Sequence, residues 1–331
     1  MSNSRRILFL DYARVLTAFL VVYAHIYSVT SQVRLYIYAF HMPLFFIISG
    51  FLHSPRTTNK ELIKYFRILF IPILFFILYG VIVSLVFFNG NIINFTSKII
   101  ENVSLHGDVP GNGTVWFLFA LLNIKLMMFF YLKVFEKRTI YVRLLFFFIV
   151  FGFFFGIRLL FGPPINPFFL KQSFMAFPLY FIGYNARKLY DKKSLRIPDN
   201  YSNLLIALVL LVLCVLITKV NGRVSMIGFS FGHSVFPLNI LLFYTNGIVG
   251  SLMIICISLV FKRENKIITL TANSLISILG FQVPLMCVFH YFETGGNYLV
   301  SAMVSIFVIM ICVILNQIIM KICPELLGKK R

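Results

Sequence analysis

The chain has 331 residues, of which 60% are apolar, 17% aromatic and only 12% charged. Its mean hydropathy is +0.93, and this composition excludes a water-soluble globular protein, in which about a quarter of the residues are charged. The net charge of +20 would suggest nucleic-acid binding in a soluble protein. In a membrane protein it first reflects basic loops on one side of the bilayer, and no nucleic acid is needed to explain it.

Apolar segments predict an all-α polytopic membrane protein with about ten transmembrane helices in one bundle, since a span needs about 20 residues. This leaves no room for an ordinary soluble domain, so we expect a single membrane-embedded domain over residues 1–331. The predicted spans are residues 8–29, 36–52, 68–88, 115–132, 144–161, 172–186, 203–219, 237–261, 271–290 and 298–320.

The distribution of basic residues predicts the orientation of these spans. If the N-terminus is cytoplasmic, 22 of the 30 Lys and Arg fall on the cytoplasmic side and six on the other, and Arg14 and Lys125 lie within spans. One missing or extra span would invert every later loop and destroy this asymmetry. We therefore expect both termini to be cytoplasmic.

The first predicted span carries Asp11, Arg14 and His25. Arg14 and His25 are eleven residues apart, which places them on one helix face at about 16 Å separation along the axis. Arg14 could simply extend to the inner headgroups with Asp11 as its ion partner, and His25 could be an interfacial histidine. Ionisable groups at depth usually face a polar cavity, however, so we assign these three residues to a catalytic group along such a cavity.

Three further positions are candidates for binding. His41 begins the second span on the same side as His25, unless it is an ordinary interfacial histidine. Lys64 and Arg67 stand where the third span begins, either as an orientation signal or as a clamp for a phosphorylated donor.

The fourth span adds Trp116 at its start and Lys125 near its middle. An amine at that depth reaches the headgroups poorly, so a cavity-lining role is expected for Lys125. We group His41, Trp116 and Lys125 as substrate-binding residues.

The sequence lacks the motifs of several other enzyme classes. The sequence has no GxSxG, Walker A or HExxH motif, and no pair of carboxylates within a span. Its five cysteines lie in or beside apolar segments without CxxC spacing, so neither a disulfide framework nor a metal site is expected.

Several segments together resemble the membrane acyltransferase 3 family of ten-helix O-acyltransferases. Arg14 and His25 match its Arg, ten residues, His signature, and residues 40–52, FHMPLFFIISGFL, resemble its second-helix motif. Lys64 and Arg67 are similar to its paired basic motif. Residues 115–118, VWFL, resemble its fourth-helix start, and residues 179–184, LYFIGY, its sixth-helix segment. One departure is Gln282, which stands where many members have His.

The resemblance implies an O-acyltransferase, transferring groups other than amino-acyl groups, in the cytoplasmic (inner) membrane of a bacterium. The implied donor is acetyl-CoA on the cytoplasmic side, with Arg14 at the donor and His25 essential. The implied acceptor is a sugar hydroxyl of a surface polysaccharide or of its lipid-linked precursor, as in members that acetylate fucose. Whether copies of the chain form a homo-oligomer stays open.

The residues themselves suggest how such a transfer would run. A neutral imidazole is suited to remove the acceptor hydroxyl's proton, which favours His25 as general base. Arg14, Lys64 and Arg67 would bind the CoA phosphates. The alternative is a transporter or channel for polysaccharide lipids, in which a basic cavity moves an anionic substrate and imidazole at position 25 has no special purpose.

Overall fold

The computed structural model describes residues 6–26, 29, 31–87, 101–106, 109, 111–161, 166–192, 200–221, 240–289 and 297–330. All regular structure within these residues is helical. The longer helices are α1 (Leu8–His25), α2 (Ser31–Tyr38), α3 (His41–Phe51), α4 (Asn59–Phe87), α6 (Trp116–Phe130), α7 (Ile140–Phe161), α8 (Leu170–Asp191), α9 (Asn200–Asn221), α10 (Ile240–Leu259), α11 (Lys266–Asn273), α12 (Leu275–Phe289) and α13 (Tyr298–Ile322). Short helical turns are η1 (Asn102–His106), η2 (Gly113–Val115), η3 (Tyr131–Phe135), η4 (Pro167–Phe169) and η7 (Pro324–Leu327).

Seven helices in the described ranges are long and apolar enough to cross a membrane. They are α1, the stretch that joins α2 to α3, α4, α6 with η3, α9, α10 and α13. The pair α11 and α12 would make an eighth if it is one span. Helices lie at all ten segments predicted to span, but α7 qualifies only as a shorter apolar helix over Ile140–Phe153, and α8 is not among the candidates. Ten spans therefore stays a prediction, whereas a multi-pass, all-helical membrane protein is supported.

Helix directions define two ends of the bundle. We call the end at which α1 begins the proximal end, and the end at which α1 finishes the distal end. Near the start of α1, the ring of Phe9 lies 6.4 Å from Phe51 at the end of α3 and 6.2 Å from Tyr190 at the end of α8. Tyr12 stacks on Phe261, just after α10, at 4.6 Å. Helices α3, α8 and α10 thus run opposite to α1 and finish proximally.

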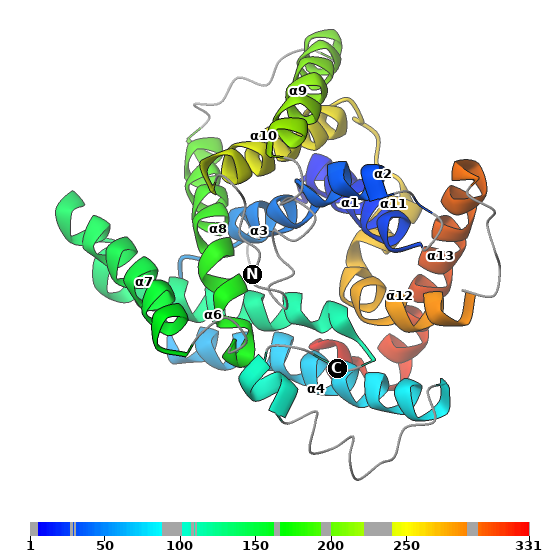
Figure 1. The fold of residues 1–331 in the computed structure, drawn as a ribbon, viewed down its shortest axis with the longest axis horizontal. Coiled ribbons are helices and arrows are strands. Elements are labelled where there is room, and N and C mark those ends of the chain that lie inside the picture. Colours follow the sequence, from blue (N-terminus) through cyan, green and yellow to red (C-terminus); the bar gives the residue numbers. More distant parts are fainter. Residues whose placement is uncertain are drawn as a thin grey trace.

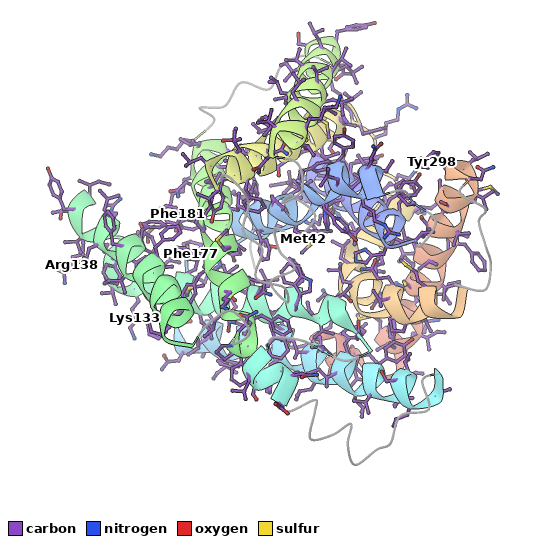
Figure 2. All side chains as sticks on the ribbon, viewed as in Figure 1. Met42, Lys133, Arg138, Phe177, Phe181 and Tyr298 are labelled. Carbon is purple, nitrogen blue, oxygen red and sulfur yellow. The ribbon has the colours of Figure 1, made fainter. Side chains whose placement is uncertain are left out.

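The central helices are α1 and α3, and α7 and α9 lie at the periphery (Figure 1). On α9, Leu205 is 64% exposed, and on α7, Phe148 is 73% exposed. Side chains of this kind are suited to contact with lipid tails rather than with water. Aromatic contacts join α7 to the bundle: Phe147 lies 5.7 Å from Phe177 and 4.9 Å from Phe181, which Figure 2 shows on the side of α8 that faces α7.

Two glycines let α3 and α8 approach closely. A Cβ at Gly50 would lie 1.9 Å from the carbonyl oxygen of Tyr180, and a Cβ at Gly183 would lie 1.9 Å from that of Ile47. Backbone therefore meets backbone on both sides of the crossing, as small residues allow in membrane helix pairs. This contact fixes α8 against the helix that begins with His41.

Two predicted spans are interrupted. The segment predicted at 36–52 divides between α2 and α3, which begins at His41 with Pro43 in its first turn. The segment predicted at 271–290 was expected as one helix, but α11 and α12 meet at a bend of 74°. The Ser274 hydroxyl at this bend donates to the Leu270 carbonyl at 2.9 Å, and such local side-chain bonds favour bending of a helix. Hydropathy alone does not detect a change of direction.

Candidate active site

Two of the candidate histidines lie together at the distal end. His25 is the last residue of α1, and His41 is the first residue of α3. The ring of Tyr38, the last residue of α2, lies 5.8 Å from the ring of His25 and 5.0 Å from that of His41. We call these three side chains the distal cluster. The structure thus joins His25 and His41 through a tyrosine that sequence reasoning did not single out.

Backbone partners determine which nitrogen of each distal histidine carries the proton. His25 Nδ1 lies 2.7 Å from the carbonyl oxygen of Val21, and His41 Nδ1 lies 2.9 Å from that of Ile37. Because a carbonyl oxygen only accepts, Nδ1 is the donor in both rings, and the lone pair of the neutral imidazole is on Nε2. Nε2 of each ring is therefore the nitrogen that can take up a proton.

Polar contacts hold α2 against the end of α1. The Nη2 of Arg34 donates to the Ile26 carbonyl at 2.7 Å, and the Tyr38 hydroxyl lies 3.5 Å from the Ala24 carbonyl. The last carbonyls of a helix lack donors within the helix, so these contacts satisfy groups that the end of α1 leaves free. They also fix the Tyr38 ring beside His25.

Asp11 and Arg14 lie at the opposite end of α1. The buried Asp11 carboxylate accepts a hydrogen bond from Arg6 Nε, and its other oxygen lies 3.7 Å from Arg14 Nη2. Arg6 also donates to the carbonyl of Thr269 in α11 at 3.2 Å. In the part of the chain that is described, the buried Nε of Arg14 has no partner. Asp11 therefore orients Arg14. Arg14 and His25 lie on the same helix, α1, but toward opposite ends of it.

The paired cations begin α4 and differ in their surroundings. The Lys64 ammonium pairs with Glu61 at 2.8 Å, and that carboxylate is itself buried. Arg67 is one turn further along, and its Nε is buried without a hydrogen-bond partner among the described residues. Arg67 therefore has a buried donor that is unused, whereas the Lys64 ammonium group is paired and half-exposed.

Trp116 and Lys125, which the sequence grouped with His41, have different neighbours. The ring of Trp116 at the start of α6 lies 6.4 Å from Phe46 of α3. About two and a half turns later, Lys125 Nζ lies 4.9 Å from the ring centroid of Tyr65 near the start of α4 and donates to the Tyr180 hydroxyl at 3.4 Å. Lys125 thus faces the start of α4, whereas His41 lies at the distal end.

A third histidine, which sequence reasoning missed, completes the surroundings of Lys125. His53 follows α3 and is only 5% exposed, and its Nδ1 lies 2.8 Å from the Tyr180 hydroxyl. Burial, followed by the charges of Lys125 and Lys64, lowers the pKa of His53 to about 3, so the ring is neutral at physiological pH. We call His53, Lys64, Tyr65, Lys125 and Tyr180 the proximal cluster. The sequence indicated this cluster only through Tyr180, which lies in the segment 179–184 that resembles the sixth-helix segment of the family.

Gln282 is the position that departs from the family pattern. It lies on α12, its side chain is fully buried, and neither atom of its amide has a hydrogen-bond partner within the described chain. An unpaired buried amide is costly, by about 1–3 kcal/mol. The structure gives no role for it.

Comparison with known proteins agrees with the arrangement of these residues on a helical membrane bundle. A family defined as an acyltransferase domain matches residues 7–318, which is nearly the whole chain. No curated protein and no solved structure matches it. The matched region includes both clusters, the central helices and the peripheral ones, and on this evidence the chain belongs to the acyltransferase 3 family.

Proposed function

We propose that the protein is a membrane O-acyltransferase that moves an acyl group, in the first place acetyl, from cytoplasmic acyl-CoA to a sugar hydroxyl. The acceptor is a surface polysaccharide or its lipid-linked precursor, and the membrane is the bacterial inner membrane. The observation that carries the proposal is the bond from His25 Nδ1 to the Val21 carbonyl, which leaves Nε2 as a base at the distal end. The family membership supports the reaction class.

The chemistry follows from the state of this imidazole. The sugar hydroxyl oxygen attacks the thioester carbon while Nε2 of His25 takes the hydroxyl proton. The carbon–sulfur bond breaks, its electron pair goes to sulfur, and the proton held by His25 passes to the CoA thiolate. The products are the acylated sugar and CoA, and His25 returns to its starting form.

In this proposal the acyl donor and the sugar acceptor bind at opposite ends of the bundle. Arg14 and Arg67 each have an unused Nε donor, and with Lys64 they would hold the phosphates of acyl-CoA at the proximal end. His25 lies eleven residues beyond Arg14 on α1, about 16 Å along the helix, a distance that an extended pantetheine arm can cover. His41 and Trp116 would contact the sugar from the distal side.

The test is acyl transfer by the purified protein in detergent. Release of free CoA thiol from acetyl-CoA should depend on added sugar acceptor, and the acetyl group should be recovered on the sugar. A transporter for polysaccharide lipids would instead move its lipid across a vesicle membrane without consuming acetyl-CoA. Lipid movement with no thiol release would overturn the proposal in favour of that alternative.

A further inference from the structure

Lys125 is a membrane-embedded cation that contacts no carboxylate among the described residues. It lies near the middle of the span Gly113–Phe135, and no described carboxylate lies within 4.0 Å of its ammonium group. Within the described residues it contacts the Tyr180 hydroxyl and the faces of the Tyr65 and Tyr180 rings. Glu61, the acid at the start of α4, is already paired with Lys64. A charge at this depth normally has a counter-charge in contact with it, and no described carboxylate takes that place.

A hydrogen-bonded chain runs from Lys125 to His53. Lys125 Nζ can only donate, so the Tyr180 oxygen accepts from it at 3.4 Å. The arrangement that uses every proton then has the Tyr180 hydroxyl donating to His53 Nδ1 at 2.8 Å. The neutral ring of His53 therefore carries its proton on Nε2. This is the reverse of His25, whose proton is on Nδ1.

The proximal cluster contains buried hydrogen-bond donors without an acceptor among the described residues. His53 Nε2 and the Tyr65 hydroxyl are both buried and have no partner among the residues described. The two rings lie 5.8 Å apart, so both donors belong to one small region. Two unpaired donors beside an uncompensated ammonium group form a site for an anion with several acceptor oxygens.

We propose that the proximal cluster binds a phosphate group of the acyl donor. Lys125 supplies the counter-charge, His53 Nε2 and the Tyr65 hydroxyl donate hydrogen bonds, and Tyr180 is a positioning residue that fixes the proton of His53. The inference rests on the proposed function and deepens it, because it adds Lys125, His53 and Tyr65 to the residues that bind the donor phosphates. It also moves Lys125 from the sugar to the donor.

The hydrogen-bonding groups of the cluster favour phosphate over a sugar as its ligand. A sugar hydroxyl needs acceptors as well as donors, whereas His53 Nε2 and the Lys125 ammonium group offer only donors. The Glu61 carboxylate already has Lys64 as its ion partner. The Lys64 side chain is 47% exposed, so it is the most exposed member of the cluster. An anion arriving from the proximal side would meet Lys64 first and would reach Lys125 next.

The experiment compares two probes that differ by one phosphate, 4′-phosphopantetheine and pantetheine. Binding is measured by titration calorimetry of the full chain in dodecyl maltoside, a detergent without phosphate. Lys125→Met should raise the Kd for 4′-phosphopantetheine by about 10- to 100-fold, the range for a hydrogen bond to a charged group. The Kd for pantetheine should not change. Lys133→Met, on the exposed side of η3, is the matched control and should leave both values unchanged.

Variants of His53 and Tyr180 test the hydrogen-bonded chain. His53→Leu should weaken binding of 4′-phosphopantetheine, whereas His53→Gln, whose amide can donate from the position of Nε2, should restore much of it. Tyr180→Phe should weaken binding less than Lys125→Met, because Tyr180 acts through His53. Tyr131→Phe removes the hydroxyl of another buried tyrosine and is the control. Thermal unfolding of each variant separates lost binding from lost folding, and only variants that unfold near the wild-type temperature are compared.

The outcomes separate this inference from the proposed function. If the wild type binds neither CoA nor 4′-phosphopantetheine, the donor assignment of the proposed function fails. If it binds both, and Lys125→Met and His53→Leu bind them equally well, the subsite is wrong while the proposed function stands. Phosphatidylglycerol added to the micelles should not compete with 4′-phosphopantetheine. Competition that disappears in Lys125→Met would assign the cluster to a lipid headgroup and overturn the proposal.

Discussion

His25 and His53 have opposite hydrogen-bonding surfaces because their Nδ1 atoms meet different partners. The Val21 carbonyl can only accept, so His25 offers a lone pair at Nε2. The Tyr180 hydroxyl can donate, so His53 offers an N–H at Nε2. One imidazole can take up a proton at Nε2 and the other can donate a hydrogen bond from Nε2, although both residues are histidines.

The role of His25 can be tested with two amide substitutions. His25→Gln and His25→Asn should each lower acyl transfer by about 10²–10⁴-fold, since neither amide takes up a proton at neutral pH. Acyl-CoA binding should stay near the wild-type value, because the donor is held at the other end of α1. Asparagine is the closer structural control, since its amide can still donate to the Val21 carbonyl.

The same assay over a range of pH adds a second check. The wild-type rate should fall on acidification, because a protonated imidazole has no lone pair at Nε2. Wild-type acylation by His25→Gln would show that His25 is not the base.

Asp11 contacts both Arg6 and Arg14, so we expect it to act as a positioning residue, and its substitution tests this. In Asp11→Asn, Arg6 and Arg14 lose their shared carboxylate, so the apparent KM for acyl-CoA should rise several-fold while kcat changes less. The control is Asp191→Asn, which removes an exposed carboxylate paired with Arg187 at 2.8 Å. Such exposed pairs contribute little, about 0.3–0.5 kcal/mol, and activity should not change. A fall in kcat at constant KM would instead favour a direct catalytic part for Asp11.

At the scale of single residues, the sequence indicates candidates by their ionisable side chains and by their depth in a predicted span. It identified His25, Arg14 and Lys125 because ionisable groups in a span are rare. It could not find His53, since a histidine just past a helix looks like any interfacial residue until Tyr180, 127 positions later, is placed against it. It grouped Lys125 with the sugar-binding residues by depth alone, which does not show which neighbour the side chain faces, and that grouping stays a prediction.

At the scale of helices, the α3–α8 crossing depends on Gly50 and Gly183. Either Cβ would lie within 1.9 Å of a carbonyl oxygen of the facing helix, and backbone cannot move aside as a flexible side chain can. Residues 40–52, which include α3, are therefore held against α8 by a backbone contact that leaves no space for a side chain at either glycine.

Gly183→Ala and Gly50→Ala should each lower the thermal unfolding temperature in detergent by several degrees and reduce activity. Gly152→Ala on α7 is the control, because its Cβ would meet nothing within 4 Å. That substitution should be neutral or slightly stabilising, by up to about 1 kcal/mol from helix propensity. Equal unfolding temperatures for the three variants would contradict the tight crossing.

The positions of helices were more predictable than their continuity. Hydropathy located a helix at each predicted span, since apolar length is a direct requirement of the bilayer. It could not show that the segment around Ser274 bends by 74°, because the apolar residues continue through the bend. It also treated α2 and α3 as one helix, although His41 starts a new one.

For the molecule as a whole, the orientation in the membrane remains the main untested prediction. Reporter fusions at Lys137, Lys192 and Arg331 should report the cytoplasm, and fusions at Asn112 and Asn297 should report the opposite side. The physical reason is the excess of Lys and Arg in alternate loops. Alkaline phosphatase and green fluorescent protein fusions read opposite sides and serve as mutual controls. One cytoplasmic reading at Asn297 would be enough to break the ten-span arrangement.

Helix α3 has a consequence for which donors can react. It begins with His41 and ends just before His53, twelve residues apart or about 18 Å, and the glycine contacts with α8 prevent it from sliding. If the donor phosphate binds beside His53, α3 sets a fixed distance between that phosphate and the distal cluster, where we propose that His25 removes the proton. A carrier with a shortened arm would bind by its phosphate but stop short of the base, so the protein would select its donor by arm length, without contacting the whole arm.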